Sequence, residues 1–150
     1  MKLKILTTFF MMLLVNNVIA QQKKHNPKDQ VSSLNWDIIG SIRYTLNDKN
    51  QLIANFSESM ERFKNKTFEL EGYLIPIKNK RMHDRCLLSP LPINQCFYCG
   101  SNGVPAMILI EMKKPIPYSE KTIHISGILK LAEGDNNVPV SLIQAETFEK

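Results

Sequence analysis

The side chains best suited to chemistry in this sequence are its three cysteines, Cys86, Cys96 and Cys99. Two of them are separated by two residues in the segment Cys96-Phe97-Tyr98-Cys99-Gly100. A tight turn of this length can place both sulfur atoms on one metal ion, and a following glycine tolerates the positive φ that such a turn needs. The spacing is typical of one half of a zinc-knuckle site, and a complete structural zinc site requires four ligands.

A second pair with the same two-residue gap, His83 and Cys86, precedes it. Together, His83, Cys86, Cys96 and Cys99 make a set of three sulfurs and one nitrogen, which is a ligand set that zinc uses. The alternative interpretation makes His83 an exposed turn residue and Cys86 a small buried hydrophobic residue on a strand.

The cysteine pair also allows two readings without a metal. A thiol–disulfide enzyme needs the pair at the start of a helix, but Gly100 and Gly103 follow here and are poor helix formers. The oxidoreductase is therefore the minor alternative. A structural Cys96–Cys99 disulfide needs neither metal nor catalysis, and its very short loop would give it little entropic stabilisation.

The first 20 residues, Met1 to Ala20, are predicted to be a cleavable secretory signal peptide. Lys2 and Lys4 give a positive start, and the apolar run from Ile5 to Val15 is shorter than the roughly 20 residues that span a bilayer. The alternative is an N-terminal membrane anchor. Export predicts a periplasmic or secreted protein, in a compartment where an odd number of cysteines leaves one without an intramolecular partner.

The remaining 130 residues are enough for one domain. We expect residues 21–33 to be a flexible leader and residues 34–150 to be one β-barrel-like domain. Without Lys2 and Lys4, the 19 basic side chains fall to 17 against 14 acidic ones. An excess of three positive charges is ordinary and does not favour nucleic-acid binding.

The pattern before residue 66 predicts an aromatic anchor and a helix. Trp36 is the only tryptophan, and we expect it to hold its segment on the core. Asn55 to Lys64 is a helix candidate, with Asn55 as N-cap and Glu58 three residues later. Phe56, Met60 and Phe63 recur at helical spacing and form an apolar stripe, which is expected to pack on a sheet.

Beyond residue 66 the sequence predicts strands. Apolar and polar residues alternate from Thr67 to Glu71, and Gly72 is expected to mark a bend that lets a longer strand serve two sheets. Residues 78–81 form a basic turn. The other predicted strands are Arg85–Ser89, Val104–Met112, Lys121–Leu131 and Val140–Phe148, with a loop over Lys113–Tyr118.

These elements predict a mainly β fold: a small five-stranded antiparallel barrel, preceded by a short helical segment and similar to the oligonucleotide/oligosaccharide-binding (OB) barrel. A split sandwich is the alternative.

Three segments taken together resemble a known family. They are Glu71–Pro76, Leu87–Pro90 and Cys96–Gly100, the last followed by Gly103 and Pro105. The series resembles an uncharacterised family of exported bacterial proteins, in the version that carries a cysteine-aromatic-aromatic-cysteine-glycine segment. The resemblance implies a barrel-like domain tied to metal handling or to a membrane transport system, and it carries over only Cys96 and Cys99 as site residues.

The leading functional hypothesis is a non-enzymatic exported protein that binds zinc or copper through Cys96 and Cys99. The second is an interaction module that docks an envelope or transporter protein, touches the membrane only indirectly, and uses the cysteines as a structural disulfide. The sequence contains no serine–histidine–acid pattern, no glycine-rich phosphate loop and no paired-carboxylate signature. Nucleic acid is not an expected partner.

Overall fold

The computed structural model describes residues 26–95, 106–132 and 139–149. Its helical segments are η1 (Pro27–Asp29), α2 (Leu34–Gly40) and α3 (Glu58–Glu61). Its strands are β1 (Arg43–Leu46), β2 (Leu52–Asn55), β3 (Thr67–Pro76), β4 (Met82–Ser89), β5 (Ile108–Pro117), β6 (Ile123–Leu131) and β7 (Val140–Thr147). No helix in these ranges is long and apolar enough to cross a bilayer.

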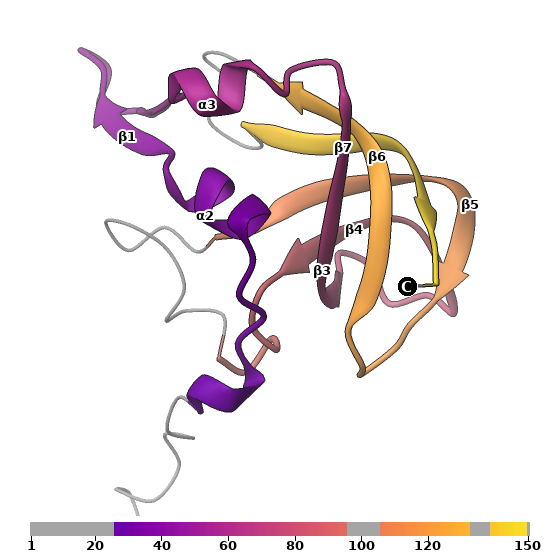
Figure 1. The fold of residues 1–150 in the computed structure, drawn as a ribbon. Helices are drawn as coiled ribbons and strands as arrows, with labels where there is room; N and C mark the ends of the chain where they lie inside the picture. The colour runs from indigo at the N-terminus through magenta and orange to yellow at the C-terminus, as the bar shows by residue number, and fades with distance from the viewer. Residues whose placement is uncertain (1–25, 96–105, 133–138, 150) are drawn as a thin grey trace, which may run out of the picture.

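Five strands close into a barrel in the order β3-β4-β5-β7-β6, and β6 pairs back onto β3 (Figure 1). The mainly β barrel predicted from the sequence is therefore confirmed. The prediction that every pair is antiparallel is wrong, because β5 and β7 run parallel. A closed ring with an odd number of strands cannot alternate direction at every step, so at least one neighbouring pair must be parallel.

Strand β3 exchanges one neighbour for another at Gly72. It pairs with β6 from Thr67 to Gly72 and with β4 from Tyr73 to Pro76. A Cβ atom at residue 72 would lie 2.7 Å from the backbone oxygen of Ser89, closer than real Cβ atoms come to a neighbour. The glycine singled out in the sequence therefore permits a close approach of β3 to the end of β4.

The core is filled by alternate residues of the barrel strands. On β3, Phe68, Leu70 and Leu74 are buried, while Thr67 and Glu69 are exposed. The same cluster takes in Trp36 from α2 and Met60 from α3. Burial of each such large apolar side chain contributes about 1.5–3 kcal/mol, so the helical segments are held by the barrel core rather than by their own short length.

Helix α2 begins at a serine cap and is fixed to β3 by two side-chain hydrogen bonds. The Ser33 hydroxyl accepts from the backbone N–H of Trp36 at 3.2 Å and caps the helix. The Trp36 indole N–H donates to the carbonyl of Glu71 at 2.7 Å, and the Asn35 amide donates to the carbonyl of Glu69 at 2.6 Å. The predicted anchoring role of Trp36 is confirmed, since its side chain is buried in the core.

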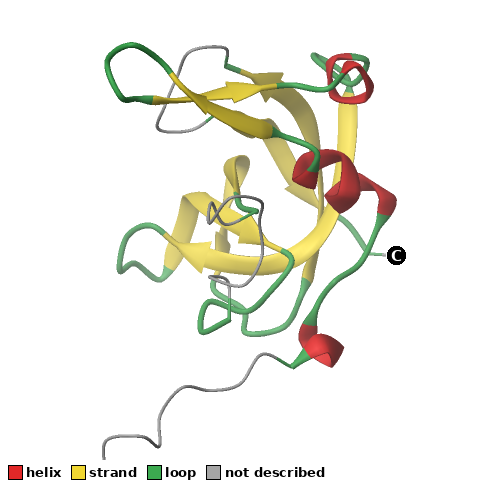
Figure 2. Ribbon diagram, turned by 90° about the vertical axis from the view of Figure 1, so that its left-hand side faces the viewer, coloured by secondary structure: helices red, strands yellow, loops and turns green. Residues whose placement is uncertain are grey.

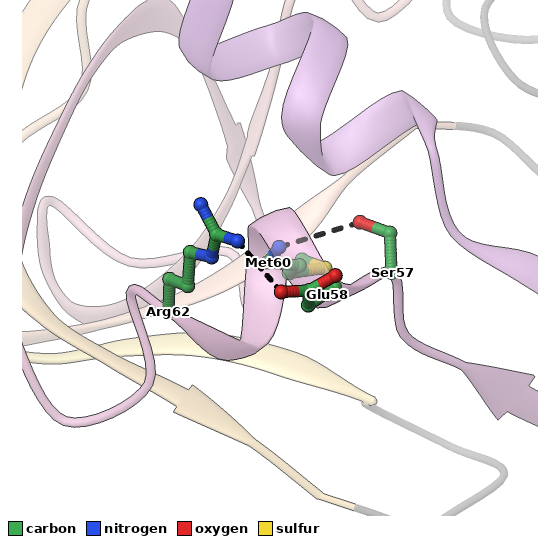
Figure 3. A network of polar contacts seen from close by, with 4 residues as sticks. All are labelled: Ser57, Glu58, Met60 and Arg62. Carbon is green, nitrogen blue, oxygen red and sulfur yellow. Dashed lines mark hydrogen bonds and ion pairs between the residues drawn. The ribbon is translucent and has the colours of Figure 1, made fainter.

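Helix α3 is shorter than the predicted helix from Asn55 to Lys64. Its N-cap is Ser57, whose hydroxyl accepts from the Met60 N–H at 3.3 Å (Figure 3). Asn55 cannot cap, because it ends β2, where it pairs with Arg43. Phe56 and Phe63 lie outside α3, so the stripe is not helical throughout. Its predicted packing on the barrel is confirmed: Met60 is fully buried, Phe56 packs against the core, and the Phe63 ring packs edge-on against Phe68 with centroids 5.2 Å apart.

A β-hairpin that the sequence did not predict precedes α3. Strands β1 and β2 pair antiparallel as a separate two-stranded sheet that projects beside the barrel (Figure 2). A run of polar residues from Asn47 to Asn50 forms its turn: the Asn47 side chain accepts from the N–H groups of Lys49 and Gln51, both at 2.9 Å. Asn50 takes a φ of 58°, which asparagine tolerates better than most residues.

Strand β5 continues to Pro117, through the region predicted as a loop. Its pairing with β7 ends at Met112, opposite Ala145, whereas its pairing with β4 continues to Pro117, opposite Met82. The last part of β5 therefore has one registered neighbour, and prolines are tolerated in a strand whose other edge is unpaired.

Candidate functional site

The cysteine pair of the leading hypothesis lies outside the described residues. Cys96 and Cys99 belong to the connection between β4 and β5, within the range 96–105. The structure describes the residues on both sides of this range: Gln95 before it, and Ala106 after it. The geometry of the predicted site is therefore known for these flanks, for Cys86 and for His83.

The flank before Cys96 is tightly held. Gln95 is only 4% exposed. Its side-chain oxygen accepts from the backbone N–H of Asn26 at 2.8 Å, and its amide group donates to a carboxylate oxygen of Asp29 at 2.7 Å. The end of the predicted leader is thus hydrogen-bonded to the start of the cysteine segment, and Val31 also donates its N–H to the carbonyl of Pro90 at 2.9 Å.

A cavity of about 380 Å³ adjoins the same flank. Pro92, Ile93 and Asn94, just before Cys96, form one side of it. Its other lining residues are Tyr73, Leu74, Tyr118, Ser119 and Glu120. The chain therefore enters the cysteine segment beside a hollow with both aromatic and polar walls.

Cys86 has the character of a buried hydrophobic residue. It is a free thiol with no exposed surface, and it belongs to the barrel core on β4. Burial raises its pKa from 9.0 to about 11, since desolvation disfavours the thiolate. A thiol with this pKa is neutral at pH 7, whereas a metal ligand is a thiolate, so the surroundings of Cys86 favour the second interpretation given from the sequence.

His83 is buried, contrary to the alternative that placed it at an exposed turn. Its side chain lies on β4 with only 3% exposure, next to an irregularity in the β4–β5 register between His83 and Arg85. Its Nε2 atom has no hydrogen-bond partner among the described residues. Within those residues no three His, Cys, Asp or Glu side chains gather as a metal site, so His83 and Cys86 make no such group with another described residue.

His83 lines a second cavity, of about 280 Å³, which we call the basic pocket. Its other walls are Ile77, Lys78 and Lys80 from the β3–β4 connection, Asp84, Arg85 and Leu87 from β4, and Leu109 from β5. The sequence contained one signal for this pocket, the run of basic residues at 78–81 just before His83, but nothing in it placed β5 beside that turn.

Comparisons of the chain with protein-family models, with curated proteins and with solved structures found no match.

Proposed function

We propose that this chain is an exported protein with an OB-like barrel that binds a zinc or copper ion through the thiolates of Cys96 and Cys99. The OB-like assignment is supported by the strand order β3-β4-β5-β7-β6 and by the parallel β5–β7 pair that closes the ring. Export is supported by the predicted signal peptide, and the resemblance to an exported bacterial family points the same way.

The observation that carries the metal proposal is that Cys86 differs from Cys96 and Cys99 in its position in the fold. Cys86 is enclosed in the core, and its high pKa keeps it protonated. Cys96 and Cys99 lie on a connecting segment, at the spacing that lets two sulfurs share an ion, and Gln95 fixes the start of that segment to η1. The proposal therefore assigns the ion to the pair alone.

Two thiolates suit the chemistry of zinc or of Cu(I), because soft sulfur ligands favour these ions. A pair leaves coordination positions on zinc open, and another protein or a small ligand would complete them. Metal binding would also protect the pair from oxidation in an oxidising compartment, since a coordinated thiolate is not free to form a disulfide.

The test is the metal content and free-thiol count of protein isolated from the exported fraction. We expect zinc or copper bound in the wild type and in Cys86→Ala, and no bound metal in the double variant Cys96→Ser/Cys99→Ser. Circular dichroism of each variant checks that it is folded. A metal-free protein with an intact Cys96–Cys99 disulfide, whose reduced form binds neither ion, would refute the proposal.

The hairpin supports a second candidate, an interaction module for an envelope or transport complex. Leu46 and Leu52 lie opposite each other in the β1–β2 pair, and they are 64% and 44% exposed. Exposed apolar side chains on a projecting hairpin are suited to a protein contact. Chemical cross-linking in intact cells, compared between wild type and Leu46→Ser/Leu52→Ser, tests it. A cross-linked partner retained equally by the variant would argue against the hairpin as the contact.

A further inference from the structure

The residues that line the basic pocket do not include the cysteine pair of the proposed metal site. It lies between the β3–β4 connection and the face of β4 and β5 that carries Arg85, whose side chain is 60% exposed. Its volume of about 280 Å³ is close to the lower limit of small-molecule sites, about 300 Å³. Its lining residues do not belong to the main barrel core cluster, although Leu87 packs against the smaller cluster of Ile75 and Leu91 and Leu109 is only 6% exposed.

Positive side chains outnumber negative ones around this pocket. Lys78, Lys80 and Arg85 are lining cations, and Asp84 is the only lining acid. A hydrogen bond from its own backbone amide lowers the pKa of Asp84, and the charges of Lys80 and Lys78 lower it further. Arg85 pairs with Glu111 at 3.3 Å, outside the lining. The excess of cations favours an anionic occupant.

His83 supplies a polar atom that lacks a partner. The residue is a wall of the basic pocket and is 97% buried, from its 3% exposure, yet Nε2 makes no hydrogen bond with any described residue. Buried polar side-chain atoms in folded proteins are nearly always hydrogen-bonded, so such an atom calls for an explanation. Nε2 has less than 1 Å² of accessible surface, so the imidazole must turn toward the cavity before an anionic oxygen bound there can accept its N–H.

The remaining walls are apolar. Leu87 and Leu109 lie opposite each other in the β4–β5 pair, and Ile77 faces the same cavity from the β3–β4 connection. Leu87 packs against the small cluster of Ile75 and Leu91, and Leu109 is 6% exposed, whereas Ile77 is 48% exposed. An alkyl chain attached to the anionic group would lie on the exposed parts of these side chains and gain the free energy of apolar burial, which a bare inorganic anion would not.

We propose that the basic pocket binds an amphiphilic organic anion. Its charged group lies near Lys78, Lys80 and His83, and its short apolar chain lies on Ile77, Leu87 and Leu109. Two sources share this chemistry: a free amphiphile, and a lipid of an anionic membrane surface.

The experiment uses octyl phosphate as the probe and full-length, isotope-labelled protein. Nuclear magnetic resonance follows the imidazole signals of His83 during titration, with inorganic phosphate as the comparison probe. We expect a saturable shift of His83 with octyl phosphate, at an affinity at least tenfold higher than that for inorganic phosphate. No saturable shift of His83 with octyl phosphate, or equal affinity for the two probes, would overturn the proposal.

Matched charge variants test the cations without disturbing the core. Lys78→Gln/Lys80→Gln removes two positive charges at the basic pocket, and Lys49→Gln/Lys121→Gln removes two from exposed positions outside its lining. We expect octyl phosphate to bind about tenfold more weakly to the first variant and less than twofold more weakly to the second. Equal weakening in both variants would mean that net charge alone explains the effect, and it would overturn the assignment.

Vesicles distinguish the two sources. Sedimentation with phosphatidylglycerol vesicles but not with phosphatidylcholine vesicles, lost in Lys78→Gln/Lys80→Gln and kept in Lys49→Gln/Lys121→Gln, would support a membrane lipid as the occupant. Ile77 and Met82 are 48% and 47% exposed beside the basic turn, where they would meet such a surface. Binding of octyl phosphate without sedimentation would support a free amphiphile.

Discussion

The indole ring of Trp36 lies against the position where a side chain on Gly72 would begin. A Cβ atom at residue 72 would be 3.2 Å from Cζ2 of Trp36, and the Trp36 N–H donates to the carbonyl of the preceding residue, Glu71, at 2.7 Å. The two residues are thus fitted to each other, and they join α2 to β3 at the point where β3 exchanges β6 for β4.

A methyl group at this point should destabilise the fold. In Gly72→Ala the new atom would meet the Ser89 backbone oxygen at 2.7 Å and Leu88 Cγ at 2.9 Å, and the backbone oxygen cannot move cheaply. We expect the free energy of unfolding to fall by about 2–3 kcal/mol, as in other overpacked cores. Urea denaturation followed by circular dichroism measures it.

Gly40→Ala is the matched control. A Cβ atom there would have no neighbour within 4 Å, and Gly40 ends α2. We expect a stabilisation of about 0.5–1 kcal/mol, because alanine restricts the unfolded chain more than glycine does. Equal effects of the two substitutions would contradict the account of Gly72.

The hydrogen bond donated by Trp36 should contribute more to the free energy of unfolding than the exposed one donated by Asn35. Trp36→Phe leaves the carbonyl of Glu71 without its indole donor in a partly buried place, and we expect a loss of about 1–3 kcal/mol. Asn35→Ala removes an exposed hydrogen bond to the carbonyl of Glu69, and we expect the free energy of unfolding to fall by about 0.5–1 kcal/mol. Thermal or urea unfolding gives the order, and a larger loss in Asn35→Ala would contradict it.

The thiol of Cys86 should be unreactive in the folded protein. It is fully buried with a pKa of about 11, so at pH 8 it is neither accessible nor ionised. In the variant Cys96→Ser/Cys99→Ser, we expect a thiol reagent such as dithionitrobenzoate to modify Cys86 only after urea is added. Rapid modification without denaturant would show that the core around β4 is open.

Because of the Cys86 thiol, the folded protein should become less stable at alkaline pH. Its folded pKa of about 11 is higher than the value of 9.0 without burial, so its contribution is complete below pH 9 and is lost as the pH rises to 11. We expect the wild type to lose about 2 kcal/mol more than Cys86→Ala over this interval, measured by urea unfolding at each pH. Parallel curves would contradict the raised pKa.

Gln95 should hold the N-terminal segment in place. Replacing it by methionine removes both the acceptor for the Asn26 N–H and the donor to Asp29 while keeping a side chain of similar length. We expect faster amide hydrogen exchange over residues 26–31, measured by mass spectrometry. Asn94→Ala, at the exposed neighbouring position, is the control and should leave that exchange unchanged.

Local patterns in the sequence were sufficient for much of the barrel. The alternation from Thr67 and the single tryptophan correctly indicated β3 and the anchor on the core. The glycine at residue 72 does mark a change in the pairing of β3, but between two neighbours in one barrel rather than between two sheets. These features are local because strand alternation and the absence of a Cβ atom at glycine act within a few residues. The helix from Asn55 was overextended, because its proposed cap is paired with Arg43 in a hairpin that local patterns did not indicate.

By itself, the sequence determined the period-two strands, the aromatic anchor and the spacing of the cysteine pair. Tertiary structure alone decided that β5 and β7 are parallel, that Cys86 lies in the core, and that His83 is buried in the wall of a basic pocket. Each of these depends on which distant strands become neighbours. Closing five strands into a ring settles that pairing, and with it the burial and charge surrounding each side chain.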